Sequence, residues 1–386
     1  MINFDFMTAN RIIFGPGTSK KIGENVKPFG NKALIISGIP DDHIDLIITK
    51  SLQDAGIKYF IRKIGTEPTV GMIEKTIEEF LHYECDFVIG LGGGSAIDTG
   101  KAVAILANNP GDPYDYLEVV GKGKRLINKP LPCIAVPTTS GTGSEVTKNA
   151  VLTAEEFGVK VSLRNAFMLP VLAIIDPELT LSLPPEITAS TGIDALTQLI
   201  EPFVSNRSNP ITDSLCREGI KRAARSLPIA FQDGQNINAR QDMCIASLFG
   251  GIALANARLG AVHGFAAPLG GLLKAPHGAL CARLLPIVFE INITALLNRS
   301  PESEALPRFL EICKLITDHP LATFQNGIDW LLNLTKYVKI PSLAAYELRR
   351  DDFRILVENA SKSSSMQGNP IQLEEDELFK ILERAF

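Results

Sequence analysis

Short runs of β-branched and other apolar residues alternate with helical segments in the first half of the chain. These runs predict strands over residues 33–37, 58–62, 86–91, 132–136 and 172–175. Strands separated by helices are typical of a parallel sheet with crossover connections. A further alternation over residues 150–164 predicts a β-hairpin inserted before the last strand.

The pattern changes after Leu183-Pro184-Pro185, where strand-like runs give way to long helical stretches, including residues 187–203, 238–259 and 374–386. We therefore predict an α/β domain over residues 1–184 and an all-helical domain over residues 185–386. A chain of 386 residues commonly forms two domains, and ligands commonly bind in a cleft between domains.

The composition is that of an ordinary globular protein, with 45% hydrophobic residues, 21% charged residues and a formal net charge of -5. The chain has no basic cluster of the kind that binds a nucleic-acid backbone. Residues 1–15 contain neither a basic segment nor a long apolar run of a secretory signal. We expect a cytoplasmic protein with a small-molecule partner, and neither nucleic acid nor a membrane.

The cysteines stand singly, and no two of them form a C-x-x-C pair. Most of them have apolar neighbours, which favours buried thiols over disulfides or a thiolate metal site. The six residues are Cys85, Cys133, Cys216, Cys244, Cys281 and Cys313.

A glycine-rich turn, Gly92-Gly93-Gly94-Ser95, directly follows one predicted strand and precedes a predicted helix over residues 96–107. Unpaired amides and the positive end of a helix dipole there form a site for an anion such as a pyrophosphate. The alternative is a tight turn in which Ser95 and Asp98 form a capping box that only starts the helix.

A second loop of small polar residues, 137–144, follows the predicted strand that ends at Val136. Two such loops at the carboxyl edge of a parallel sheet are typical of a nucleotide-binding crevice. A flexible surface loop is the alternative. Because neither loop has the G-x-G-x-x-G pattern, we expect a Rossmann-like fold that differs from the standard arrangement.

Polar residues in the helical half could converge on a divalent metal. Asp194 and Gln198 lie four residues apart on a predicted helix and so share one face. A carboxylate, two imidazoles and an amide would suit iron, manganese or zinc, although each residue alone could equally belong to the core or the surface. The imidazoles are those of His263 and His277, and between them Pro268, Gly270, Gly271 and Pro276 predict a loop that folds back.

Several motifs together resemble the iron-containing (group III) alcohol dehydrogenases over nearly the whole chain. The resemblance implies a dehydroquinate synthase-like fold, with an N-terminal dinucleotide-binding domain, a C-terminal helical domain and a metal in the cleft. It also implies transfer of a hydride between NAD or NADP and a small alcohol or aldehyde, in a homodimer or larger homo-oligomer. The motifs span residues 92–98, 137–145, 176–180, 192–196, 268–271 and 276–278.

By this resemblance the metal ligands are Asp194, Gln198, His263 and His277, and all of these except Gln198 are also expected to be catalytic. The family usually has histidine in place of Gln198. An amide oxygen is a weaker and harder donor than imidazole, which favours Fe²⁺, or Mn²⁺, over Zn²⁺. The site could also have lost its metal, as in the similar maleylacetate reductases.

The resemblance also implies a set of cofactor contacts. Because Gly38 stands where the family often has an aspartate for the ribose 2′-hydroxyl, NADP should be tolerated, while Asp41 and Asp42 leave NAD open. Ala267 replaces a histidine that assists proton transfer in many members. The expected cofactor-binding residues are Gly38, Gly93, Gly94, Ser95, Asp98, Thr138, Thr139, Thr142, Lys160, Leu179 and Leu183, of which Lys160 could be a surface charge and the leucines core residues.

Three other functions remain open at this point. The first is a metal-free maleylacetate reductase-like enzyme, and the second is a nucleotide-binding protein without catalysis. The third is a dehydroquinate synthase, against which stands the lack of clustered Lys and Arg in the helical half. Apolar residues near the proposed site could line a pocket for a short substrate or pack the helices: Leu254, Leu259 and Phe265.

Overall fold

The computed structural model describes residues 3–39 and 45–386, and the chain forms two compact units. We call residues Thr8–Thr139 and Gly143–Thr180 the α/β unit. The helical unit comprises Leu181–Phe386 together with Ser140–Thr142 and the N-terminal residues up to Met7.

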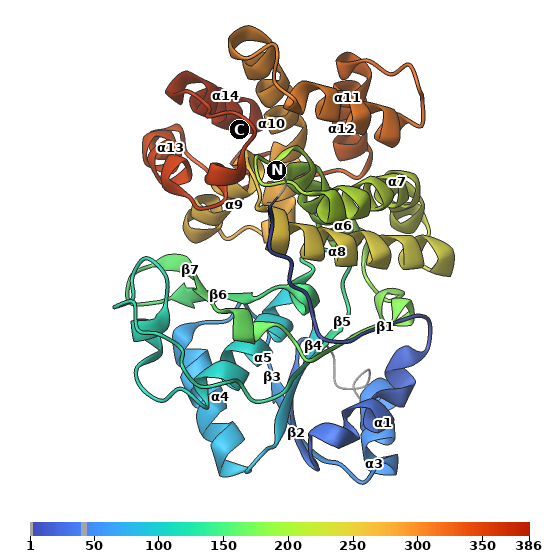
Figure 1. The fold of residues 1–386 in the computed structure, drawn as a ribbon, viewed down its shortest axis with the longest axis vertical. Helices are drawn as coiled ribbons and strands as arrows, with labels where there is room; N and C mark the ends of the chain where they lie inside the picture. The colour runs from blue at the N-terminus through green and yellow to red at the C-terminus, as the bar shows by residue number, and fades with distance from the viewer. Residues whose placement is uncertain (1–2, 40–44) are drawn as a thin grey trace. The chain divides into compact units, whose positions relative to one another are not determined.

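The α/β unit is built on a six-stranded sheet in which every neighbouring pair is parallel (Figure 1). The strand order is β1-β8-β5-β4-β2-β3, and β6 and β7 form a separate antiparallel pair. The strands are β1 (Ile12–Phe14), β2 (Lys32–Ser37), β3 (Lys58–Lys63), β4 (Phe87–Gly92), β5 (Cys133–Pro137), β6 (Asn149–Ala154), β7 (Val159–Arg164) and β8 (Leu172–Ile175).

Helices cover both faces of this sheet, which explains why its central strands are apolar at almost every position. Alternate residues of β2 enter different cores. Leu34 and Ile36 pack with α4 (Val70–His82) and α5 (Gly94–Leu106). Ala33 and Ile35 pack with α1 (Ile22–Val26) and α3 (Lys50–Asp54).

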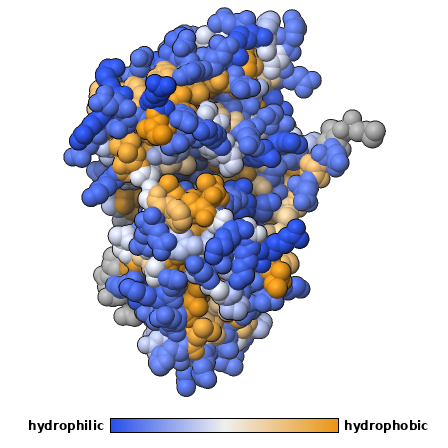
Figure 2. All heavy atoms as spheres, turned by 90° about the vertical axis from the view of Figure 1, so that its left-hand side faces the viewer, coloured by the Kyte–Doolittle hydropathy of each residue, from blue (hydrophilic) through white to orange (hydrophobic). Residues whose placement is uncertain are grey.

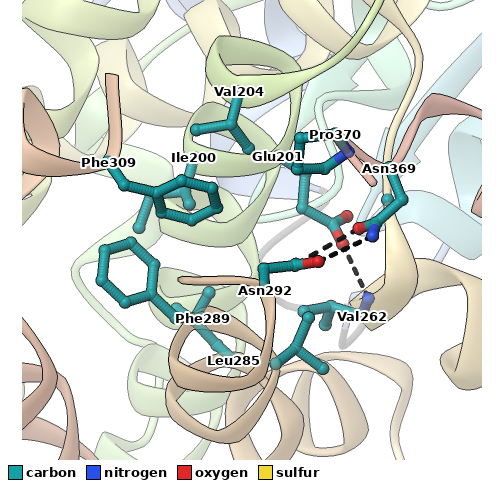
Figure 3. A pocket seen from close by; sticks show the side chains of 12 residues that line it. Ile200, Glu201, Val204, Val262, Leu285, Phe289, Asn292, Phe309, Asn369 and Pro370 are labelled. Atoms are coloured by element: carbon teal, nitrogen blue, oxygen red, sulfur yellow. Dashed lines mark hydrogen bonds between the residues drawn. The ribbon is translucent and has the colours of Figure 1, made fainter. Parts of the chain in front are cut away.

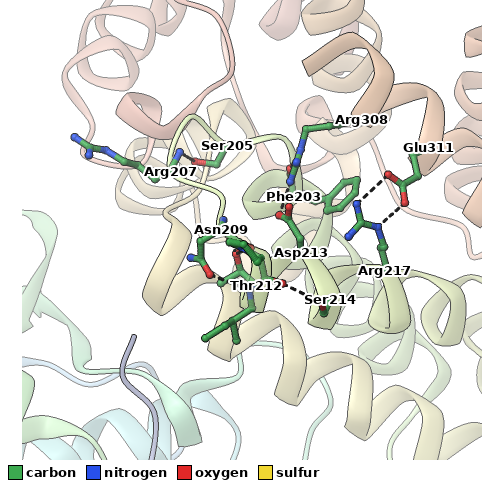
Figure 4. Close-up of polar contacts among 12 residues, drawn as sticks. Phe203, Ser205, Arg207, Asn209, Thr212, Asp213, Ser214, Arg217, Arg308 and Glu311 are labelled. Atoms are coloured by element: carbon green, nitrogen blue, oxygen red, sulfur yellow. Dashed lines mark hydrogen bonds and ion pairs between the residues drawn. The ribbon is translucent and has the colours of Figure 1, made fainter. Parts of the chain in front are cut away.

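The helical unit surrounds one continuous apolar core to which nearly all of its helices contribute. Polar contacts connect several helices near the C-terminal end of the first helix of this unit, as Figure 4 shows. Arg308 donates to the carbonyl of Phe203 at 2.6 Å, and Arg217 forms two hydrogen bonds with Glu311. The helices are α6 (Pro185–Val204), α7 (Pro210–Gln232), α8 (Ile237–Ala257), α9 (Ala261–Leu272), α10 (His277–Arg299), α11 (Ala305–Thr317), α12 (Phe324–Tyr337), α13 (Phe353–Lys362) and α14 (Glu375–Ala385).

By length and composition, α10 is the one helix in the described part of the chain that could span a membrane alone. Helices α8 and α9 pass the same test only as a pair, and they are bent by 98°. However, 78% of the most apolar window of α10 is buried inside the protein, which is typical of a core helix. On the face shown in Figure 2 the surface is mostly hydrophilic.

The expected parallel sheet, inserted hairpin and helical second half are confirmed. Strand β1 is an addition that the apolar pattern did not predict. The predicted loop between His263 and His277 is wrong in extent, because α9 continues through Pro268 to Leu272. Only residues 273–276 separate α9 from α10, so the proline is accommodated within the helix.

Candidate active site

The strand order of the α/β unit reverses between β2 and β4. The chain runs from β2 to β3 on one side and then returns to place β4 on the other side of β2. Such a reversal of strand order is where open parallel sheets bind nucleotides. Gly38 follows β2, and Gly93 caps α5 directly after β4. The predicted glycine loop therefore lies at the switch point of the sheet.

Close contacts explain the glycines at this edge of the sheet. Gly92 has φ +146°, and a Cβ there would lie 2.9 Å from the Cβ of Ala96 and 3.1 Å from the Cα of Gly38. A Cβ on Gly93 would lie 3.5 Å from Oγ1 of Thr139. The amide of Thr138 also donates to the carbonyl of Gly92 at 3.0 Å. The two predicted loops thus lie against each other, with Gly38 beside them.

The capping box of Ser95 and Asp98, considered above as the alternative to an anion site, does not form, because Gly93 caps α5 and no side chain caps it. Instead, Asp98 accepts from Oγ of Ser144 at 2.5 Å and from the amide of Val151 at 2.9 Å. Its carboxylate also pairs with Lys101 Nζ at 3.0 Å. Lys101 is itself buried and donates to the carbonyl of Ser144 at 3.0 Å. Asp98 therefore holds the second loop against α5.

The other predicted cofactor residues occupy varied surroundings. Lys160, on β7, forms an ion pair with Glu67. Leu179 is buried in the core on the α1 and α3 side of the sheet. Leu183 is partly buried in the helical unit, to which Thr142 also belongs. Asp41 and Asp42 lie outside the described residues.

A cluster of potential metal ligands lies entirely within the helical unit. Asp194 on α6 has its Oδ1 3.4 Å from Nε2 of His263 on α9 and 3.9 Å from Nε2 of His277 on α10. Cys281, one turn after His277, places its Sγ 3.5 Å from His277 Nε2 and 3.8 Å from His263 Nε2. One ligand atom from each of the four residues lies within 4.8 Å of all the others.

Two buried oxygens at this cluster fit a cation. Asp194 is 1% exposed and Gln198 is 3% exposed, and both come from α6. Neither Oδ1 of Asp194 nor Oε1 of Gln198 has a hydrogen-bond partner among the described residues. Buried oxygens without partners are costly, and a bound divalent metal would satisfy both. The donors present therefore fit the metal that the sequence predicts.

Glu201 fixes the orientation of His263. Its Oε1 accepts from the amide of Val262 at 2.7 Å, as Figure 3 shows, and its Oε2 lies 2.6 Å from Nδ1 of His263. Because an ionised carboxylate only accepts hydrogen bonds, Nδ1 carries the proton, and the lone pair of Nε2 faces the cluster. The histidine is thus held in the tautomer that a metal ligand needs.

Opposing effects set the pKa values in this cluster. Burial raises the pKa of Asp194, but the neighbouring His263 and His277 outweigh burial and lower it overall. Burial lowers the pKa of His263, but the neighbouring Cys281 and Glu201 outweigh burial and raise it well above its usual value. A site that stabilises a proton on histidine would also stabilise a metal cation.

Sequence reasoning missed Glu201 and Cys281. The signal for Glu201 was its position seven residues after Asp194 on the same face of α6, and for Cys281 its position four residues after His277. Phe265, considered for a substrate pocket, is instead fully buried in the helical core. Ala267, where the resemblance expects a proton-transferring histidine, is exposed on α9.

The chain matches two described families along almost its whole length. Residues 9–177 match "Iron-containing alcohol dehydrogenase", and residues 188–386 match "Fe-containing alcohol dehydrogenase family, C-terminal". The chain belongs to the iron-containing alcohol dehydrogenase family. The predicted enzyme class, a metal-dependent alcohol dehydrogenase with a nicotinamide cofactor, is confirmed by this membership and by the relatives.

Individual relatives of this family cover the chain nearly completely. The 1,3-propanediol dehydrogenase of Citrobacter freundii is 36% identical over 400 positions, 99% of each chain. The NAD-dependent methanol dehydrogenase of Bacillus methanolicus is 31% identical over 396 positions, 100% of each. The solved structure of an alcohol dehydrogenase from Oenococcus oeni has a TM-score of 0.90 at 35% identity and covers 100% of both chains. These similarities favour the alcohol dehydrogenase over the alternative functions.

Proposed function

We propose that this chain interconverts a small alcohol and its aldehyde with NAD(P), using a divalent metal held by Asp194, Gln198, His263 and His277. The observation that carries this proposal is the pair of unpartnered buried oxygens on α6 beside two histidine nitrogens. In this family's chemistry a bound divalent metal acts as a Lewis acid toward the substrate oxygen.

In this proposal residues 1–184 bind the dinucleotide and residues 185–386 bind the metal and substrate. The amides at the start of α5 and the hydroxyls of the second loop would hold the phosphates, because the first loop lies at the switch point of the sheet and the second follows the adjacent strand β5 and contacts the first. Asp98 would act through its hold on Ser144. The proposed contacts are Gly38, Gly93, Gly94, Ser95, Asp98, Thr138, Thr139, Thr142, Lys160, Leu179 and Leu183.

The absence of an acidic side chain at Gly38 removes one source of repulsion toward a ribose 2′-phosphate. We therefore propose that NADP is accepted as well as NAD, the cofactor in the name of the methanol dehydrogenase relative. The ion pair of Lys160 with Glu67 leaves Lys160 partly neutralised, so we assign it a supporting position rather than the main phosphate contact.

The residues of the helical unit have separate tasks. Glu201 holds the proton on Nδ1 of His263 and so keeps Nε2 available. With alanine at position 267, protons released by the reaction would leave through water or the cofactor ribose. Substrates are proposed to be short alcohols or aldehydes, since one relative is named for 1,3-propanediol and another for methanol. The enzyme is proposed to be cytoplasmic and a homodimer or larger homo-oligomer.

Metal analysis tests this function directly. The protein is purified without chelators, its metal content is measured, and reduction of a panel of short aldehydes is assayed with NADH and NADPH. We expect about one divalent ion per chain, and loss of turnover after chelation that returns on adding Fe²⁺ or Zn²⁺. Full turnover in a preparation without metal would contradict the proposal and favour the maleylacetate reductase-like alternative.

A further inference from the structure

The cysteine in the ligand cluster is not accounted for by a site built from Asp194, Gln198 and two histidines. Cys281 is fully buried on α10, and its sulfur contacts Nε2 of both histidines. It lies one helical turn after His277, so both side chains leave the same face of α10. A buried thiol among ligand atoms, rather than among apolar side chains, calls for a chemical reason.

The distances in the cluster match the edges of a tetrahedron around one ion. Metal–ligand bonds of about 2.0–2.3 Å place neighbouring ligands of a tetrahedral zinc site about 3.3–3.6 Å apart. The observed separations are 3.4 Å for Asp194 to His263, 3.5 Å for Cys281 to His277, 3.8 Å for Cys281 to His263 and 3.9 Å for Asp194 to His277. Small side-chain adjustments would bring all four separations to the values expected around one ion.

The charges of the direct ligands also favour Cys281 as a ligand. With Asp194 as the one charged ligand, the ion and its direct ligands would carry one net positive charge, which Glu201 offsets from behind His263. A thiolate from Cys281 would make the ion and its direct ligands neutral by themselves. The thiol proton is released to solvent as the sulfur–metal bond forms.

We propose that Cys281 is a metal ligand of this enzyme, completing a set of one carboxylate, two imidazoles and one thiolate, with Gln198 as an additional oxygen donor. Thiolate is a soft ligand that suits zinc, so this set holds Zn²⁺ in preference to Fe²⁺, opposite to the preference expected from Gln198 alone. The inference rests on the proposed metal-dependent function and specifies the ligands of that same site.

Cobalt substitution tests the sulfur ligand without relying on activity. The full-length protein is stripped of metal, loaded with one equivalent of Co²⁺ and examined by ultraviolet–visible absorption. A cobalt–thiolate bond gives an intense near-ultraviolet charge-transfer band, which we expect in the wild type and not in Cys281→Ser. Cys313→Ser is the matched control, because Cys313 is also buried in the helical unit but its sulfur lies near the carbonyl of Phe324.

The metal preference is measured by competition between Zn²⁺ and Fe²⁺ under anaerobic conditions. We expect the ratio of bound zinc to bound iron to fall in Cys281→Ser, because serine replaces a soft sulfur donor with a hard oxygen. Bound Co²⁺ without the band in the wild type would overturn the inference, as would a band that persists in Cys281→Ser or an unchanged zinc-to-iron ratio. If Cys281→Ser does not fold, a wild-type protein that binds Co²⁺ without the band still overturns the inference.

Failure of the proposed function has a different signature. A wild-type protein that takes up metal, loses activity on chelation and shows no sulfur band would retain the function but refute Cys281 as a ligand. A wild-type protein that binds no Co²⁺ yet turns over aldehyde would refute both the metal-dependent function and the ligand set.

Discussion

Replacing Glu201 with glutamine changes which nitrogen of His263 carries the proton. Glu201 accepts 2.7 Å from the amide of Val262 and 2.6 Å from Nδ1 of His263. A glutamine of the same shape has one oxygen and one NH₂. If the oxygen stays on the Val262 amide, the NH₂ donates to Nδ1 and the ring proton moves to Nε2, where it competes with a metal.

The opposite orientation of the glutamine is less favourable. It would point NH₂ at the backbone amide of Val262 and leave a buried N–H without an acceptor, at a cost of about 1–3 kcal/mol. The tautomer change is therefore the expected response. Loss of such an orienting partner typically lowers metal affinity about 10–100-fold, or about 1.4–2.7 kcal/mol. We expect Glu201→Gln to weaken metal binding by this amount.

Competition with a chromophoric chelator measures this affinity, and urea unfolding of the metal-free protein measures stability separately. Glu311→Gln is the matched control, since it weakens a partly exposed ion pair with Arg217 in the same unit. That variant should bind metal like the wild type. Wild-type metal affinity in Glu201→Gln would refute the orienting role of Glu201.

Two further predictions concern the α/β unit. Gly92→Ala should destabilise the protein by about 2 kcal/mol or more and weaken dinucleotide binding, because its Cβ would lie 2.9 Å from that of Ala96 at φ +146°. Urea unfolding and cofactor titration measure these two effects. Gly65→Ala is the control and should be neutral in both experiments, because a Cβ there would have no atom within 4 Å. Lys101→Met should lower the free energy of unfolding by about 3–5 kcal/mol, because it leaves Asp98 without its buried cation. Lys20→Met breaks the exposed ion pair with Glu178 and should lower it by about 1 kcal/mol or less. Equal losses in the two lysine variants would contradict the importance of burial.

The parallel sheet was predictable because its central strands are apolar at nearly every position. β4 and β5 are buried throughout, and an uninterrupted apolar run bounded by turns is a clear signal. Strand β1 was not predictable in this way, since it has three partly buried residues and pairs with β8, which lies far away in sequence. Short edge strands form mainly through tertiary pairing, which local sequence does not reveal.

In α9, which continues through Pro268, tertiary packing outweighs the low helix propensity of proline and glycine. Proline and two nearby glycines disfavour helix by about 1–3 kcal/mol each, so a loop was the reasonable expectation. In the structure, Phe265 and Leu269 of α9 are fully buried in the helical core. Burial of two such side chains contributes about 3–6 kcal/mol, which is enough to offset these preferences.

The candidate metal site was predictable only in part, because residue type alone does not show a side chain's neighbours. Asp194, His263 and His277 were predicted from their residue types and from the family resemblance, and the structure brings them together. Cys281 was interpreted as one of six buried thiols, which its burial bears out. Its contacts with two histidines depend on the packing of α9 against α10, which one sequence does not specify.

The packing of α8 against α6 helps to position the metal site. A Cβ on Gly250 would lie 3.2 Å from the carbonyl of Ala195 and 3.2 Å from the Cβ of Gln198, so α8 lies close against α6 beside the ligand residues. Asp194, Gln198 and Glu201 share one face of α6, spaced four and three residues apart. Any shift of α6 would therefore move two proposed ligands and the partner of His263 together. The close packing of α8 at Gly250 thus helps to fix the position of the helix that carries Asp194, Gln198 and Glu201.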